Sequence, residues 1–98
     1  MTEAVDPEGN ETRAIHTLLD FRGKDVLEIG CGDGRMTWRY AELSANVIGV
    51  DSFEADIVRA RAETPASLRS RVVFRTADAG SLDLDPKSFD VVVFSRSI

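Results

Sequence analysis

The segment VLEIGCGDG, residues 26–34, decides the fold of this 98-residue chain. It joins a short apolar run, typical of a buried strand, to three glycines at alternate positions, Gly30, Gly32 and Gly34. Glycines in a loop permit backbone torsions that other residues avoid, and they let a ligand approach the main chain. A loop that follows a strand and opens a helix therefore indicates a ligand site at this point.

Three more apolar runs predict strands after the first one, over residues 46–51, 71–75 and 90–95. The spacing of apolar residues predicts helices over residues 13–23, 34–44 and 54–63. The connection TADAGSLDLDPKS, residues 76–88, is predicted to be a loop with at most one helical turn. Strands that alternate with helices imply a parallel sheet, so the sequence predicts an open α/β fold with about four strands.

Composition places the chain among small globular proteins. Residues 13–98 are expected to form one domain, preceded by a loose polar arm over residues 1–12. Twelve Lys and Arg against 17 Asp and Glu give a net charge of −5, which does not favour nucleic acid or an anionic membrane as a partner. With one cysteine and one histidine, no metal site is expected. The acidic start differs from a secretory signal, so a cytoplasmic location is expected.

Acidic residues stand at the ends of two of the predicted strands. Asp51 ends the second strand about 20 residues after the first glycine, where a carboxylate can accept hydrogen bonds from ribose hydroxyls. The alternative is that Asp51 only caps the next helix. Glu28 adds a second acid, which suits a cationic ligand better than a pyrophosphate. A dinucleotide loop also needs a third glycine where Arg35 stands, so dinucleotide binding is disfavoured but stays open.

Several segments in order resemble the class I S-adenosylmethionine-dependent methyltransferases, in their small-molecule, type 11-like branch. VLEIGCGDGR is similar to their first motif, and VIGVDSFEADIVRARA to their second strand and helix. TADAGSLDL resembles the segment after their third strand, and SFDVVVFSRSI their fourth strand. The resemblance covers residues 23–98 and implies a Rossmann-like sheet in the order 3-2-1-4, truncated before the C-terminal strands of the full fold.

The resemblance implies S-adenosyl-L-methionine as the cofactor and gives roles to individual residues. The glycine loop would lie under the methionine part, Glu28 would hold its amino end directly or through water, and Asp51 would bind the ribose. Asp78 and the Ala79 amide would contact the adenine. The full set of implied cofactor-binding residues is Glu28, Gly30, Cys31, Gly32, Gly34, Asp51, Ser52, Phe53, Asp78, Ala79 and Ser95. No catalytic residue can be named.

Two functions from different classes follow from these observations. The first is an enzyme that transfers a methyl group from S-adenosylmethionine to a small-molecule acceptor. The second is a non-catalytic or truncated S-adenosylmethionine-binding module that needs a partner chain to complete its sheet. The fourth strand would then be an apolar edge, and such edges pair readily with other chains. We therefore expect a homodimer through residues 90–98.

Overall fold

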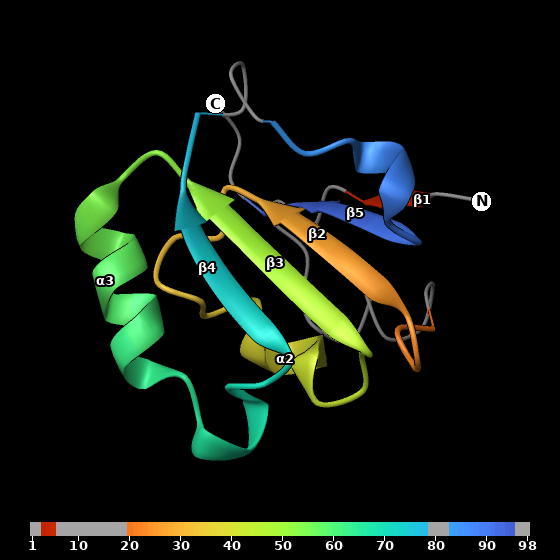
Figure 1. The fold of residues 1–98 in the computed structure, drawn as a ribbon, viewed down its shortest axis with the longest axis horizontal. Helices are drawn as coiled ribbons and strands as arrows, with labels where there is room; N and C mark the ends of the chain where they lie inside the picture. Colours follow the sequence, from red (N-terminus) through yellow and green to blue (C-terminus); the bar gives the residue numbers. More distant parts are fainter. Residues whose placement is uncertain (1–2, 6–19, 79–82, 96–98) are drawn as a thin grey trace.

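The computed structural model describes residues 3–5, 20–78 and 83–95. Within these ranges, five strands form one parallel sheet in the order β1-β5-β2-β3-β4 (Figure 1). The strands are β1 (Glu3–Val5), β2 (Asp25–Ile29), β3 (Asn46–Asp51), β4 (Val72–Thr76) and β5 (Val91–Phe94). The helices are α2 (Trp38–Ala41) and α3 (Glu54–Glu63), with short 3-10 turns η1 (Ala66–Leu68) and η3 (Pro86–Ser88).

Most of the predicted elements are confirmed. The four apolar runs form β2, β3, β4 and β5, and their order in the sheet is the expected 3-2-1-4. Helix α3 has the predicted bounds; Glu54 and Asp56 stand in its first turn, where acids favour the helix dipole, and Pro65 follows its last residues. Residues 83–90 form a loop with the single turn η3, as expected.

The first strand, β1, corrects the prediction of a loose arm over residues 1–12. Glu3–Val5 pairs in parallel with β5, with Glu3 opposite Val91 and Val5 opposite Val93. The unpaired backbone groups along the outer edge of β5 find partners in this way, so the edge that the sequence predicted to be bare is covered. The rest of the arm and the predicted helix up to residue 19 lie outside the described residues.

Helix α2 is shorter than the predicted helix over residues 34–44. Gly34 has a φ of 92°, which no right-handed helix allows, and residues 35–37 form turns. On both sides of the regular helix, hydrogen bonds join residues three apart, as from the Arg39 amide to the Met36 carbonyl and from the Leu43 amide to the Tyr40 carbonyl. Such tight bonds are typical of 3-10 geometry and end the α-helix early.

The two faces of the sheet are covered by different segments. On one face, Tyr40 of α2 and Ile57 of α3 belong to the same core cluster as Val26, Val47 and Val72 of the sheet. On the other face, Leu84 and Phe89, which flank η3, pack against a smaller cluster formed by Leu27, Val50 and Val92. The two helices therefore share one face, and a loop covers part of the other.

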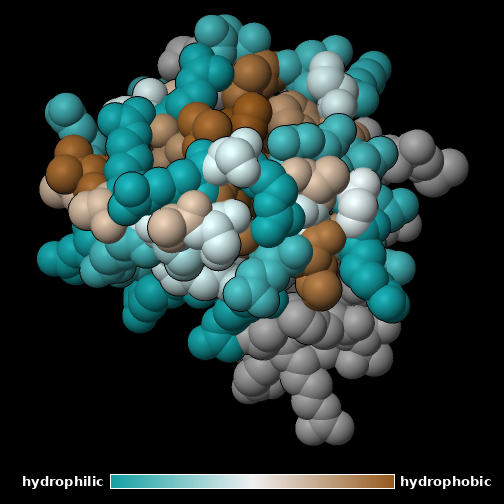
Figure 2. All heavy atoms as spheres, turned by 60° about the horizontal axis from the view of Figure 1, so that its bottom comes forward, coloured by the Kyte–Doolittle hydropathy of each residue, from teal (hydrophilic) through white to brown (hydrophobic). Residues whose placement is uncertain are grey.

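The second face is the less protected one. Val73 of β4 is 50% exposed and Phe94 of β5 is 38% exposed. Figure 2 shows that polar residues make up most of the surface in that view, with hydrophobic residues in separate patches between them. Continuous apolar strands favour a sheet that is covered on both faces, and among the described residues helices cover only the face under α2 and α3.

Gly49 of β3 has no room for a side chain and gives a first prediction. A Cβ at this position would lie 2.8 Å from Cδ1 of Phe74 and 3.1 Å from Sγ of Cys31, so both side chains would have to move. We expect Gly49→Ala to lower the free energy of unfolding by about 1–3 kcal/mol, measured by urea denaturation.

Gly23→Ala separates this steric effect from backbone strain. Gly23 has a φ of 69°, but a Cβ there would meet no atom within 4 Å. Its substitution should cost only about 1 kcal/mol, the usual penalty for a left-handed residue. A Gly49→Ala chain as stable as the wild type would contradict the packing seen here.

Candidate functional site

The glycine loop lies between β2 and α2, at the carboxyl end of the sheet. Gly30, Gly32 and Gly34 all have positive φ values, of 78°, 56° and 92°, so the alternation of glycines has the conformational reason that the sequence indicated. The amides of Gly30 and Cys31 both donate to the Val50 carbonyl, at 2.8 and 3.0 Å. The loop is thereby held against the end of the neighbouring strand β3.

Asp51 fixes the same loop from the tip of β3. Its Oδ2 accepts a hydrogen bond from the Gly32 amide at 2.8 Å, and its Oδ1 accepts one from the Phe53 amide at 2.9 Å. The second bond closes a turn before α3, whose N-cap is Phe53 and has no side-chain cap hydrogen bond, so the capping alternative is not confirmed. The side chain is 5% exposed and lies against the loop. The sequence correctly placed Asp51 beside the glycines, and the structure adds that it bonds to their backbone.

Glu28 is completely buried beneath the loop. Thr37 Oγ1 donates to Glu28 Oε1 at 2.6 Å, the Tyr40 hydroxyl donates to the same oxygen, and Ser95 Oγ donates to Oε2. Burial raises the pKa of Glu28 above its ordinary value of 4.5, although the three hydroxyl bonds act to lower it. Burial and then the charge of Glu28 raise the pKa of Tyr40 well above 10, so its hydroxyl keeps its proton.

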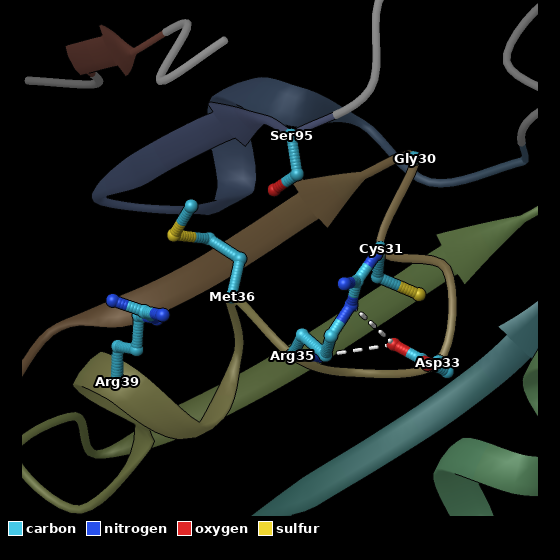
Figure 3. A pocket seen from close by; sticks show the side chains of 7 residues that line it. All are labelled: Gly30, Cys31, Asp33, Arg35, Met36, Arg39 and Ser95. Atoms are coloured by element: carbon cyan, nitrogen blue, oxygen red, sulfur yellow. Dashed lines mark hydrogen bonds and ion pairs between the residues drawn. The ribbon is translucent and has the colours of Figure 1, made fainter. Parts of the chain in front are cut away.

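A pocket of about 250 Å³ opens at the end of the glycine loop. It is lined by Gly30, Cys31, Asp33, Arg35, Met36, Arg39 and Ser95 (Figure 3). Arg35, Met36 and Arg39 come from the turn before α2 and from α2 itself, whereas Ser95 comes from the end of β5. The pocket therefore joins two segments that are far apart in sequence.

The expected site residues fall into three groups. Gly30, Cys31 and Ser95 line the pocket itself. Glu28, Gly32, Gly34 and Asp51 build its framework without lining it. Ser52, Phe53 and Asp78 are exposed beyond the ends of β3 and β4, and the Phe53 side chain is 60% exposed. Ala79 lies outside the described residues.

Six residues near the pocket were missed as site residues by the sequence reasoning. Asp33, Arg35, Met36 and Arg39 line the pocket, and Thr37 and Tyr40 hold Glu28. Asp33 also pairs with Arg35, with 3.4 Å between Oδ1 and Nε. The helical spacing of Met36 and Tyr40 indicated only packing, and no local signal joins Thr37 or Tyr40 to a carboxylate nine or twelve residues earlier.

Other chemistries find no support in the part of the chain that the structure describes. There, no three His, Cys, Asp or Glu side chains gather as a metal site would require. No helix in the same ranges has the length and apolar content needed to cross a bilayer.

Comparison with known proteins agrees with this geometry. The family described as "Methyltransferase domain" matches residues 26–98. The chain is 41% identical over 71 residues to a protein of Mycolicibacterium smegmatis named a probable S-adenosylmethionine-dependent methyltransferase, covering 72% of this chain and 26% of that protein. It is 36% identical over 85 residues to the ubiquinone biosynthesis O-methyltransferase of Roseobacter denitrificans, covering 87% of this chain and 34% of that enzyme. The chain thus spans about a third or less of these two relatives.

Solved structures have the same arrangement of strands and helices. An S-adenosylmethionine dependent methyltransferase from Mesorhizobium loti superposes with a TM-score of 0.69 at 30% identity, over 85% of this chain and 37% of that one. Phosphoethanolamine N-methyltransferase 1 of Haemonchus contortus, in complex with phosphoethanolamine and S-adenosylhomocysteine, superposes with a TM-score of 0.73 at 31% identity. That match covers 83% of this chain and 17% of the other.

The raised pKa of Glu28 predicts how stability changes with pH. Above pH 4.5 the unfolded chain releases the Glu28 proton while the folded chain still binds it, so the free energy of unfolding falls as pH rises toward the folded pKa. Glu28→Gln removes this titration. Relative to Glu28→Gln, the wild type should lose up to about 1.4 kcal/mol of unfolding free energy per pH unit in this window.

Urea denaturation from about pH 4 to about pH 8 measures the difference in free energy of unfolding between the wild type and Glu28→Gln. A difference that stays constant or grows in favour of the wild type as pH rises would contradict the burial of Glu28 as a titrating carboxyl.

Proposed function

Because the chain belongs to the class I S-adenosylmethionine-dependent methyltransferase family, we propose that it binds S-adenosyl-L-methionine along the carboxyl edge of its sheet. Methyl transfer to a small-molecule acceptor with an oxygen or nitrogen nucleophile is the activity that this binding serves. The observation that carries the proposal is the pocket beneath a glycine loop with three positive φ values, closed by Ser95 on one side and flanked by Asp51.

The residues of the site suit the parts of this cofactor. A 250 Å³ pocket is smaller than most drug-sized sites, so it would hold the methionine part, with the nucleoside outside it. An ionised carboxylate offers about four acceptor positions, and Asp51 accepts from the amides of Gly32 and Phe53 at the edge where the ribose would lie. The exposed ring of Phe53 and the exposed Asp78 lie farther along the same edge, where the adenine would lie.

The chemistry of the bound cofactor is the supply of an activated methyl group on a sulfonium. The chain's own residues would position the cofactor. The backbone of the glycine loop would set its distance from the sheet, and Asp51 would set its orientation along the ends of the strands. Alignment of two reacting atoms is worth several kcal/mol of the barrier in such displacements. The relatives named for O-methylation and for N-methylation support an oxygen or nitrogen acceptor.

Asp51→Ala tests the assignment of the ribose. Loss of hydrogen bonds to a charged group should weaken S-adenosylmethionine and S-adenosylhomocysteine by about 5- to 150-fold, or 1–3 kcal/mol, in titration calorimetry. Glu63→Ala removes an equal charge from an exposed position at the far end of α3 and should leave both affinities unchanged.

Asp51 also supports the glycine loop, so its loss could disturb the fold as well as the ribose bond. Circular dichroism of Asp51→Ala and Asp51→Asn shows whether each variant stays folded. Unchanged affinity in a folded Asp51→Ala chain would overturn the assignment. Tighter binding of a nicotinamide dinucleotide than of S-adenosylhomocysteine by the wild type would overturn the proposed cofactor.

The alternative function, a binding module without catalysis, differs only in turnover. None of the residues that line the described pocket indicates where a methyl acceptor would bind, and this supports the binding module. These residues are the glycine loop, the turn before α2, Arg39 and Ser95. Binding of S-adenosylmethionine without methyl transfer to a panel of phenols and amines would favour the module over the enzyme.

We also propose that two chains pair through the edge of β5 when β1 leaves it. In the structure Glu3–Val5 covers that edge, so the expected homodimer competes with an internal strand. Deleting residues 1–5 should therefore raise the dimer fraction in sedimentation velocity at a fixed concentration. A truncated chain that is folded and remains a monomer at high concentration would overturn the pairing.

A further inference from the structure

The outer edge of the sheet at β4 has a hollow of its own. Figure 1 shows α3 beside β4, which is the last strand on that side of the sheet. A hollow of about 250 Å³ lies between this strand, the end of α3 and η1. It is lined by Arg61, Thr64, Arg69, Val72, Val73 and Phe74. Among the described residues, it shares no lining residue with the pocket at the glycine loop.

Strand β4 turns half of its backbone groups away from the sheet. The Val47 amide donates to the Arg71 carbonyl at 2.8 Å, so that carbonyl faces β3. In a parallel pair this direction alternates from one residue to the next, so the amides and carbonyls of Val72, Phe74 and Thr76 face outward. These are the groups with which a further strand would pair.

Two arginines are held at this edge. Arg61 of α3 covers one of the outward groups, because its Nε and Nη2 both donate to the Phe74 carbonyl, at 3.1 and 2.9 Å. Arg69 follows η1, and its Nε donates to the Thr64 carbonyl at 3.4 Å. A guanidinium group has five N–H donors, so each arginine keeps donors for a ligand.

The positive charge of these arginines is not balanced at the hollow. Both side chains are exposed, and neither forms an ion pair with a described residue, although the chain has 17 acids. The described residues that line the hollow include no acid. The other wall offers apolar surface, since Val73 is 50% exposed. The hollow thus combines positive charge, apolar side chains and open strand backbone.

We propose that the outer edge of β4 binds an extended acidic segment of a partner protein, which adds to the sheet as a further strand. An amide of the segment takes the place of Arg61 at the Phe74 carbonyl. The released guanidinium, together with Arg69, binds a carboxylate of the segment. A neutral segment would displace Arg61 without giving it a new partner, so the edge favours acidic segments. This inference uses no residue of the cofactor pocket and stands apart from the proposed function.

The charge of the edge favours this occupant over a second copy of the chain. Pairing of two β4 strands would bring Arg61 and Arg69 close to the same arginines of the other copy, and like charges across a sheet are destabilising. A small anion such as phosphate would use the arginines alone. It would leave the outward backbone groups and the exposed Val73 without a partner.

Titration calorimetry on the full chain tests the proposal with three synthetic peptides. The first is acetylated and amidated Thr-Val-Thr-Glu-Thr-Val-Thr, the second has glutamine at its centre, and the third is the first with N-methyl groups on all its inner amides. The wild type should bind the glutamate peptide about 2- to 30-fold more tightly than the glutamine peptide, the range expected for two exposed ion pairs. The N-methylated peptide should not bind.

Variants show whether the two arginines carry this preference. In Arg61→Ala and in Arg69→Ala the ratio between the glutamate and glutamine peptides should fall to about 1.5- to 5-fold, and in the double variant toward one. Arg59→Ala removes an exposed arginine of α3 that does not line the hollow, so it should keep the wild-type ratio.

Hydrogen exchange followed by NMR reports whether the peptide pairs as a strand. The glutamate peptide should slow the exchange of the outward amides of Val72 and Phe74. The amide of Val73 faces β3 and should exchange at the same rate with and without the peptide.

Several results would overturn the proposal. Equal affinity for the glutamate and glutamine peptides, no binding of either at about 1 mM, or unchanged exchange of the Val72 and Phe74 amides would each do so. Displacement of the glutamate peptide by an equal concentration of inorganic phosphate would show an anion site only. Protection of the same amides that rises with the concentration of the chain alone would show pairing between copies instead.

Discussion

A buried carboxylate that is fully satisfied by hydroxyl groups holds this site together. Glu28 lies on β2, between β3 and β5, and its side chain is inaccessible to solvent. Burying a carboxylate costs several kcal/mol unless hydrogen bonds replace the lost water. Here the replacements come from Thr37 and Tyr40 around α2 and from Ser95 after β5, so the same bonds that make the burial tolerable also fix these segments around the glycine loop.

Two carboxylates on neighbouring strands fix different parts of the structure around the pocket. Asp51 bonds to backbone amides, those of Gly32 and Phe53, and so fixes the path of the loop and the start of α3. Glu28 bonds to side-chain hydroxyls and so fixes the side chains of Thr37, Tyr40 and Ser95. A change at Asp51 should therefore disturb the shape of the site, whereas a change at Glu28 should first disturb its hydrogen-bonding character.

The sequence could predict what depends on patterns within one segment. The apolar runs placed β2 to β5, and the spacing of apolar residues placed α3, since strand and helix patterns are local. The glycine loop and Asp51 were predictable because strands of a parallel sheet end at the same edge. The contact of Ser95 with Glu28 spans 67 residues and depends on the pairing of β5 with β2, so no local pattern could reveal it.

Strand β1 was not predicted from the sequence for a different reason. It matters for the pocket because it pairs with β5, which leads to Ser95. Parallel pairing uses backbone groups alone, so three residues can form a strand without an apolar pattern of their own. Such a short ladder contributes few hydrogen bonds, each worth about 1 kcal/mol, and a competing strand could replace it at low cost. Ser95 follows β5 directly, and its amide bonds to Ile29 of β2. Whatever strand occupies the outer edge of β5 therefore helps to set the backbone at Ser95, and through it the position of a side chain that lines the pocket.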